Sequence, residues 1–363
     1  MISDTFGSLI NTKKTSHMNV FFISLVAAFI HWMGGSATPA PTVCKAGEPV
    51  VTNLIMTSAD GGKTWTDLSK GLPSVKDIRH VLVTDKETFV AVGMNQLYRL
   101  ASDGVWQKEN IGSSIMGAVM SQDSSYPANY FLGIFEGKDG PYVSIHKSGL
   151  FQRTATGYWQ AVHTDLPDNR IYNILELADG STLVGTEGGI FKNTGNGGSW
   201  VNVLSAKWVS NMTHHGAVVV TTSPTGLWVS DNYGTNWIHT LKDKMGNYAI
   251  CATPDKIYAV RPYVDTVNKE ESDQIAETAY MSSDQGKTWK PINKGVLQVD
   301  RLYQVIQSGN TLISSNSQGI GISNDHGYNW ENVFEKPGTE NMMIWKLVQQ
   351  GSVIYATKSW SGC

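Results

Sequence analysis

The segment Ser58–Trp65 reads SADGGKTW, and the same arrangement returns at Ser282–Trp289 as SSDQGKTW and at Ser323–Trp330 as SNDHGYNW. A fourth copy, SDNYGTNW, ends at Trp237, and a weaker one, NTGNGGSW, ends at Trp200. The copies match the pattern S-x-D-x-G-x-T-W, and the first three keep its Ser, Asp, Gly and Trp. Because Ser and Asp side chains bond nearby backbone, Gly permits a positive φ and Trp supplies a large ring, the pattern predicts a turn anchored by tryptophan.

The role predicted for this box is structural, with its tryptophan packed between neighbouring sheets. The residues assigned to the three best copies are Ser58, Asp60, Gly62, Trp65, Ser282, Asp284, Gly286, Trp289, Ser323, Asp325, Gly327 and Trp330.

Two degenerate copies, SDGVW and RTATGYW, complete a series of seven tryptophans at intervals of 41, 53, 41, 37, 52 and 41 residues. A period near 40 residues is typical of four-stranded propeller blades. Each interval holds short runs rich in β-branched and aromatic residues, separated by Gly, Asp and Asn, most clearly over 171–203. The sequence therefore predicts an all-β, seven-bladed β-propeller. The tryptophans are Trp65, Trp106, Trp159, Trp200, Trp237, Trp289 and Trp330.

The two ends of the repeat region are each half a blade. The region begins with VTNLIMTS, a box and TWTDL, which are the last two strands, and ends with NMMIWKLVQQ and VIYATKS, which are the first two. We expect these segments to share one blade, because their pairing closes the ring and removes an open sheet edge.

A leader is predicted over 1–40. A basic pair precedes the apolar run Val20–Ile30, and small residues follow, which is typical of a secretory signal. The run is shorter than the about 20 residues of a membrane span, so we expect no span after cleavage. An uncleaved anchor and a start at Met18 instead of Met1 remain alternatives. The remaining residues, 41–363, are predicted to form a single propeller domain outside the cytoplasm, secreted or in the periplasm or cell envelope.

Three cysteines are present. Ring closure would bring Cys44 and Cys363 together, where they form either a disulfide or two thiols. Cys251 lies in an apolar strand and is expected to be a buried free thiol. No Cys/His spacing suggests a metal, and adjacent histidines such as His214 and His215 point to opposite faces of a strand. No cofactor is predicted.

From about Val50 to Lys358 the chain resembles the Asp-box (BNR-repeat) propellers, which include sialidases, xyloglucanases, the sortilin ectodomain and the photosystem II stability/assembly factors. Seven blades with a leader are most similar to the assembly factors. Sialidases are six-bladed and carry an Arg-Ile-Pro motif, which this chain lacks. Xyloglucanases have a second propeller, and sortilin has ten blades. The resemblance implies a fold much more than an activity.

Binding sites of propellers lie at the mouth of the central channel, where loops enter the first strands and join the second to the third. Four of the six arginines fall at such positions, and two of them share an Arg-x-Tyr pattern. Aromatic residues accompany them. The predicted ligand-binding residues are Arg79, Arg170, Tyr172, Trp208, Arg261, Arg301, Tyr303 and Trp345.

Two longer segments, about 135–149 and 262–278, are predicted to join second to third strands and so to lie on the same face. Arginines beside aromatic rings suit a carboxylate, sulfate or phosphate on a sugar or peptide. In the alternative interpretation the arginines only cap strand ends and pair with Asp77, Asp168 or Asp300.

Three functions remain open. The first is a monomeric binding or assembly module for an acidic glycan or acidic protein segment. The second is a sialidase-like glycoside hydrolase or lyase, for which Glu187 and Asp265 are the candidates for proton transfer. The third is a purely architectural propeller. A formal net charge of −3 gives no electrostatic reason to expect nucleic acid.

Overall fold

The strands of the computed structural model form seven antiparallel sheets of four strands each. The residues described lie in one compact unit, Pro39–Ser361. They are 53–75, 77–112, 130–162, 165–166, 170–195, 198–243, 246–253, 255–261, 279–292, 302–335 and 343–360. The predicted leader, Cys44 and Cys363 lie outside these ranges.

The seven sheets are the blades, numbered here along the chain. Blade 1 comprises β3 (Ile78–Val83), β4 (Thr88–Val92), β5 (Gln96–Leu100) and β6 (Trp106–Lys108). Blade 2 comprises β7 (Phe131–Phe135), β8 (Tyr142–Ile145), β9 (Gly149–Arg153) and β10 (Trp159–Val162). Blade 3 comprises β11 (Ile171–Glu176), β12 (Thr182–Thr186), β13 (Gly189–Asn193) and β14 (Val201–Leu204). Blade 4 comprises β15 (Asn211–His215), β16 (Val218–Ser223), β17 (Gly226–Ser230) and β18 (Ile238–Lys242).

Blade 5 comprises β19 (Ala249–Ala252), β20 (Ile257–Val260), β21 (Ala279–Ser282) and β22 (Lys290–Pro291). Blade 6 comprises β23 (Leu302–Ser308), β24 (Thr311–Asn316), β25 (Gly319–Ser323) and β26 (Glu331–Glu335). Blade 7 combines both ends of the repeat region: β27 (Met343–Gln350), β28 (Val353–Trp360), β1 (Ile55–Ser58) and β2 (Thr66–Asp67). The described residues contain no helix with the length and apolar character needed to span a bilayer.

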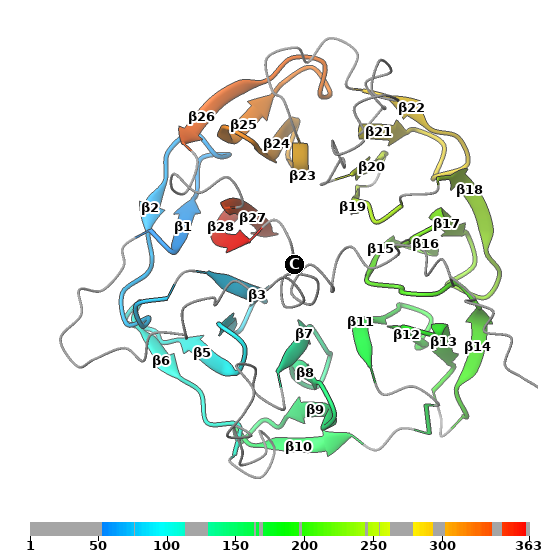
Figure 1. The fold of residues 1–363 in the computed structure, drawn as a ribbon, viewed down its shortest axis with the longest axis horizontal. Helices are drawn as coiled ribbons and strands as arrows, with labels where there is room; N and C mark the ends of the chain where they lie inside the picture. Colours follow the sequence, from blue (N-terminus) through cyan, green and yellow to red (C-terminus); the bar gives the residue numbers. More distant parts are fainter. Residues whose placement is uncertain are drawn as a thin grey trace, which may run out of the picture. The chain divides into compact units, whose positions relative to one another are not determined.

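The blades form a ring around a common centre, with each first strand innermost (Figure 1). Successive first strands contact one another in the order β3, β7, β11, β15, β19, β23, β27 and again β3. In blade 7, Ile55 pairs with Thr357 and Ser58 with Ile354, so the two ends of the repeat region share one sheet. The predicted fold class and mode of closure are confirmed.

Apolar cores lie between neighbouring blades. One cluster combines Phe89 and Leu97 of blade 1 with Val143 of blade 2, and another joins Leu54 of blade 7 to Val90 of blade 1. A strand with neighbouring blades packed on both of its faces has a continuous apolar sequence. β4 is an example, since all of its residues are buried. Sheet-on-sheet packing therefore positions the loops at the channel mouth.

The box turns are held by their own side chains. Ser282 Oγ donates to Asp284 Oδ1 at 2.7 Å and accepts from the Gly286 amide at 2.8 Å. The amide and hydroxyl of Thr288 donate to the two Asp284 oxygens at 2.9 and 2.6 Å. Gln285 and Gly286 both have positive φ, at 60° and 83°, which explains the glycine. The turns at Asp60 and Asp325 repeat these bonds.

Several box tryptophans reach the preceding blade. Trp106 Nε1 donates to the Leu68 carbonyl of blade 7 at 2.6 Å, and Trp289 Nε1 donates to Thr240 Oγ1 of blade 4 at 3.0 Å. An indole that spans two sheets and bonds the second one stabilises their docking.

The box turns predict an acid-sensitive fold. Hydrogen bonds from Thr288 lower the pKa of Asp284 from 3.8 to about 2, and those from Asn329 also lower the pKa of Asp325. Between the unfolded pKa of 3.8 and the folded pKa of about 2, the unfolded chain binds more protons than the folded one. The stability contributed by these carboxylates is therefore fully present above about pH 4 and is lost as the pH falls toward about 2. The double variant Asp284→Asn/Asp325→Asn should therefore lose less of its own Tm than the parent between these pH values.

The measurement is thermal unfolding across that pH range. An Asp231→Asn variant is the control, because this exposed carboxylate adjoins a box whose central acid is already replaced by Asn232. Parallel Tm–pH curves for the parent and the double variant would contradict the assignment.

The predicted strand order is wrong in blade 2. Residues 135–149 do not form a loop from a second to a third strand, because Phe135 ends the first strand, β7, and the second strand, β8, follows within that range. A five-residue apolar run fits a first or a second strand equally well, so periodicity did not distinguish them. The extra residues of this blade instead separate β6 from β7.

Candidate functional site

Bulges mark the entrances of four first strands. The pairing register shifts between residues 78 and 80, 131 and 133, 171 and 173, and 302 and 304. The shifted positions include Arg79, Tyr172 and Tyr303, three of the predicted site residues. A bulge leaves one residue outside the ladder and redirects its side chain, which is common beside functional sites. The Arg79 carbonyl accepts a bond from Lys346 Nζ at 3.2 Å.

A cationic cluster, defined as Arg79, Arg170, Lys346 and Lys358, lies at these entrances. Burial raises the pKa of Tyr130, and the charges of Arg79 and Arg170 oppose this effect. Burial also raises the pKa of Asp77, against the charges of Arg79, Lys346 and Lys358. Blades 7, 1 and 3 thus supply the cations whose charges act on Tyr130 and Asp77.

Two histidines beside the cluster carry little positive charge at neutral pH. Burial, followed by the charges of Lys346 and Arg79, lowers the pKa of His80 from 6.5 to about 3. Burial and the charges of Lys147 and Arg170 lower the pKa of His146. The His146 ring stacks on Tyr130 with centroids 4.7 Å apart, forming a flat wall next to the arginines.

Four predicted residues meet at the junction of blades 3 and 4. Arg170 forms an ion pair with Glu187, and the rings of Tyr172 and Trp208 stack with centroids 6.2 Å apart. The Trp208 amide donates to the Glu187 carbonyl at 2.9 Å. Trp208 has a φ of 59°, a strained conformation for a bulky non-glycine residue.

Arg261 does not belong to this arrangement. Its guanidinium forms an ion pair with Asp243, donates to the Tyr248 hydroxyl at 3.0 Å and lies 5.5 Å from the centre of that ring. The side chain is buried. The interpretation in which arginines pair with acids is therefore correct here, although the partner is Asp243 and not one of the three acids proposed.

Trp345 and Tyr303, predicted to line the ligand site, are placed in the core by the structure. Trp345 is 2% exposed, packs against Phe334 and donates from Nε1 to the Glu335 carbonyl at 2.9 Å. Tyr303 is buried as well. Both rings serve the core, because a residue near a strand entrance can point into the sheet packing as easily as into the channel. Arg301 and Asp265 lie outside the described residues and stay predictions.

Sequence reasoning missed Tyr130, His146, Lys346 and Lys358. The two lysines carry no Arg-x-Tyr signal, although both lie on strands of blade 7. The two aromatic residues were missed because the strand order of blade 2 was misassigned. A correct blade 2 would have placed Tyr130 directly before a first strand.

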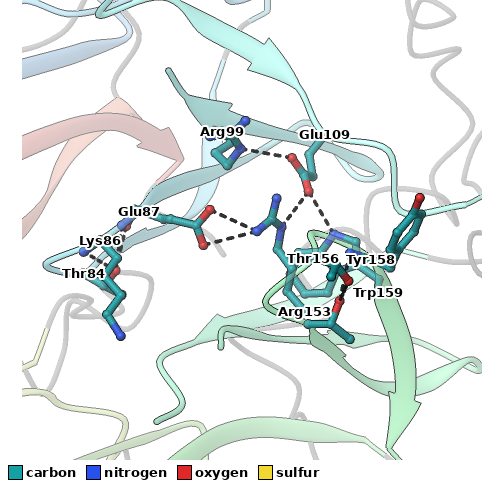
Figure 2. A network of polar contacts seen from close by, with 10 residues as sticks. Thr84, Lys86, Glu87, Arg99, Glu109, Arg153, Thr156, Tyr158 and Trp159 are labelled. Atoms are coloured by element: carbon teal, nitrogen blue, oxygen red, sulfur yellow. Dashed lines mark hydrogen bonds and ion pairs between the residues drawn. The ribbon is translucent and has the colours of Figure 1, made fainter. Parts of the chain in front are cut away.

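A second polar network lies between blades 1 and 2 (Figure 2). Arg153 Nε donates to Glu109 Oε1 at 2.8 Å, and Nη1 donates to Glu87 at 3.0 and 3.4 Å. Glu109 also accepts from Trp159 Nε1 at 3.3 Å and lies 3.4 Å from Arg99. Since these groups satisfy one another across the blade junction, we interpret the network as a structural clamp.

Metal and thiol chemistry find no support in the described residues. No group of three or more His, Cys, Asp or Glu side chains there could hold a metal ion. His214 and His215 are exposed at the end of β15. Burial raises the pKa of the Cys251 thiol to about 11, which keeps it protonated and unreactive.

Fold and site together define a seven-bladed β-propeller with a cationic channel mouth. Residues 46–300 match the family model described as the DUF6242 beta propeller domain, so the chain belongs to this family. None of the curated proteins compared with the chain matches it.

Solved structures share the fold at low identity. "YCF48 bound to D1 peptide" has a TM-score of 0.52 and 12% identity, covering 85% of this chain and 98% of that chain. "Streptogramin B lyase structure" also has a TM-score of 0.52 and 12% identity, covering 79% and 95%. An ancestral GH74 enzyme has a TM-score of 0.50 and 14% identity, covering 78% of this chain and 40% of that one. At such identities the likeness shows the fold alone.

Proposed function

We propose that this protein is a secreted or cell-envelope binding module whose channel mouth holds an acidic segment of another protein. The observation that carries the proposal is the cationic cluster: in the described part of the mouth, Arg79, Arg170, Lys346 and Lys358 accompany the acids Asp77 and Glu187. This local excess of positive charge contrasts with the net charge of −3 of the whole chain. Cationic side chains bind carboxylates through charge-assisted hydrogen bonds.

The rings of the site favour a peptide that also carries apolar groups. The Tyr172–Trp208 stack and the Tyr130–His146 stack are half-buried, so each presents part of a flat surface beside the charges. A propeller of the same fold is known with a peptide ligand, in the structure named "YCF48 bound to D1 peptide". The resemblance to Asp-box assembly factors supports the same kind of ligand.

A glycoside hydrolase or lyase is the second candidate, favoured by the aromatic stack beside Glu187. The Glu187 carboxylate is engaged by Arg170 and would have to leave that pair to act on a glycosidic bond. Its proposed companion, Asp265, lies outside the described residues. An acidic glycan bound without turnover would use the same cations.

The binding proposal predicts that loss of either arginine weakens peptide binding. Each of Arg79→Ala and Arg170→Ala should lower the affinity of residues 41–363 for an Asp-Gly repeat peptide by about tenfold, as expected for a lost charged hydrogen bond. Affinity should also fall with added salt, because the attraction is between exposed charges. Fluorescence anisotropy with a labelled peptide measures both effects.

Two controls make the test specific. The Asn-Gly analogue of the peptide should bind far more weakly, and Lys290→Ala, which removes an exposed charge from the outer strand of blade 5, should change nothing. Equal binding of the two peptides, or full affinity in both arginine variants, would contradict the proposal. Release of sugar from acidic glycans, lost in Arg170→Ala, would favour the hydrolase instead.

A further inference from the structure

The Arg170–Glu187 pair is accessible to a ligand. Arg170 precedes β11, Glu187 follows β12, and the two strands are neighbours in blade 3. The side chains are 42% and 25% exposed, so the pair as a whole is partly open to solvent. An ion pair in this position is weak, and a competing anion can replace one partner.

The backbone that carries Glu187 is fixed. Its carbonyl accepts from the Trp208 amide at 2.9 Å, and the carbonyl of Thr186 accepts from the Val209 amide at 3.1 Å. Thr186 Oγ1 accepts from the Gly188 amide at 3.1 Å and donates to the Gly189 carbonyl at 3.1 Å. The turn is therefore held on both sides, and only the flexible side chain of Glu187 can move away from Arg170 without rearranging it.

The surroundings of Arg170 match those of the other cations. The charge of Arg170 acts on Tyr130 and His146, and that of Arg79 also acts on Tyr130. A carboxylate that reaches this wall meets two guanidinium groups, one of which already holds a carboxylate from the protein itself. Glu187 thus carries the same chemical group as the expected ligand, a carboxylate, and binds the same guanidinium, that of Arg170.

We propose that Glu187 is an internal competitor, whose carboxylate occupies Arg170 in the ligand-free protein and is displaced by a carboxylate of the acidic segment. This inference rests on the proposed function. It makes Glu187 a determinant of affinity and specificity: weakly or singly charged segments do not displace it, whereas a segment with a carboxylate aligned on Arg170 does.

The test is a double-mutant cycle on peptide affinity. Glu187→Gln keeps the length of the side chain and removes its charge, so it should raise the affinity for the Asp-Gly repeat peptide by about three- to fivefold. In an Arg170→Ala background the same change should give little or no gain, because no guanidinium remains to be released. Glu331→Gln, which removes an exposed charge on the outer strand of blade 6, is the matched control.

The outcomes separate the inference from the proposed function. Unchanged affinity in Glu187→Gln overturns the inference, and so does an equal gain with and without Arg170, which would indicate general repulsion. If Arg79→Ala still weakens binding in either case, the binding function stands alone. If neither the parent protein nor any folded variant binds the peptide, both are overturned.

Discussion

An Arg153→Ala protein is expected to lose about 3–5 kcal/mol of unfolding free energy, the cost of breaking a buried ion pair on one side. Arg153 ends β9 of blade 2 and bonds Glu109 and Glu87 of blade 1, as Figure 2 shows. The side chains of Arg153 and Glu109 are only 13% and 10% exposed. Without the guanidinium, the carboxylates of Glu87 and Glu109 stay in the junction, and that of Glu109 is almost fully buried. The cation–π contact of Arg153 with the Phe89 ring is lost as well.

Urea unfolding measures this change, because urea does not screen charges. Arg99→Ala is the matched control: Arg99 contacts the same Glu109 at 3.4 Å but is 32% exposed, so its loss should cost no more than about 1 kcal/mol. Adding Glu87→Gln to the Arg153→Ala variant should restore part of the stability, since one unpaired charge disappears. Equal losses in the two arginine variants would show that the clamp is no stronger than a surface contact.

Trp345→Ala should destabilise the protein by a similar amount, about 3–5 kcal/mol, as large-to-small changes in a core do. The indole lies between blades 6 and 7, with its ring centroid 5.5 Å from that of Phe334, which in turn is 5.7 Å from Trp65. Truncation opens a cavity at the blade that closes the ring. It also removes the donor to the Glu335 carbonyl.

Two further measurements assign the effect of Trp345. Trp345→Phe keeps most of the ring and loses only the hydrogen bond, so it should cost about 1–2 kcal/mol. Peptide affinity, measured under conditions where the Trp345→Ala protein is folded, should stay within about twofold of the parent. A variant with normal stability and weak binding would restore Trp345 to the ligand wall and contradict its burial.

The fold could be predicted because its repeat is carried by local chemistry. Ser282, Asp284 and Gly286 specify a turn through their own hydrogen bonds and dihedral angles, so the turn can be recognised from one sequence without an alignment. Blade 2 was harder, since its box is degenerate and the run at Phe131–Phe135 fits more than one strand of a blade. Strand order there depends on packing between blades, which periodicity does not report.

The candidate site could be predicted only in part. The topology placed Arg79 and Arg170 at the mouth, and in the structure the charges of both oppose the rise in the pKa of Tyr130 that burial causes. The direction of a side chain is another matter, because it depends on bulges and on neighbours from other blades. Arg261 forms an ion pair with Asp243, and the Trp345 ring packs against Phe334. Neither partner could be identified from the spacing of residues along the chain.

The shared blade has a consequence for how the protein is made. β1 leaves the ribosome before the other six blades and its partner β28 leaves after them, so Ile55 cannot pair with Thr357 until all six have been synthesised. Until then the incomplete ring keeps an unpaired strand edge and the apolar side chains of blade 7 open to other chains. Such a distant pairing also makes the last folding step slow. The unfinished protein is therefore the form most in need of a chaperone.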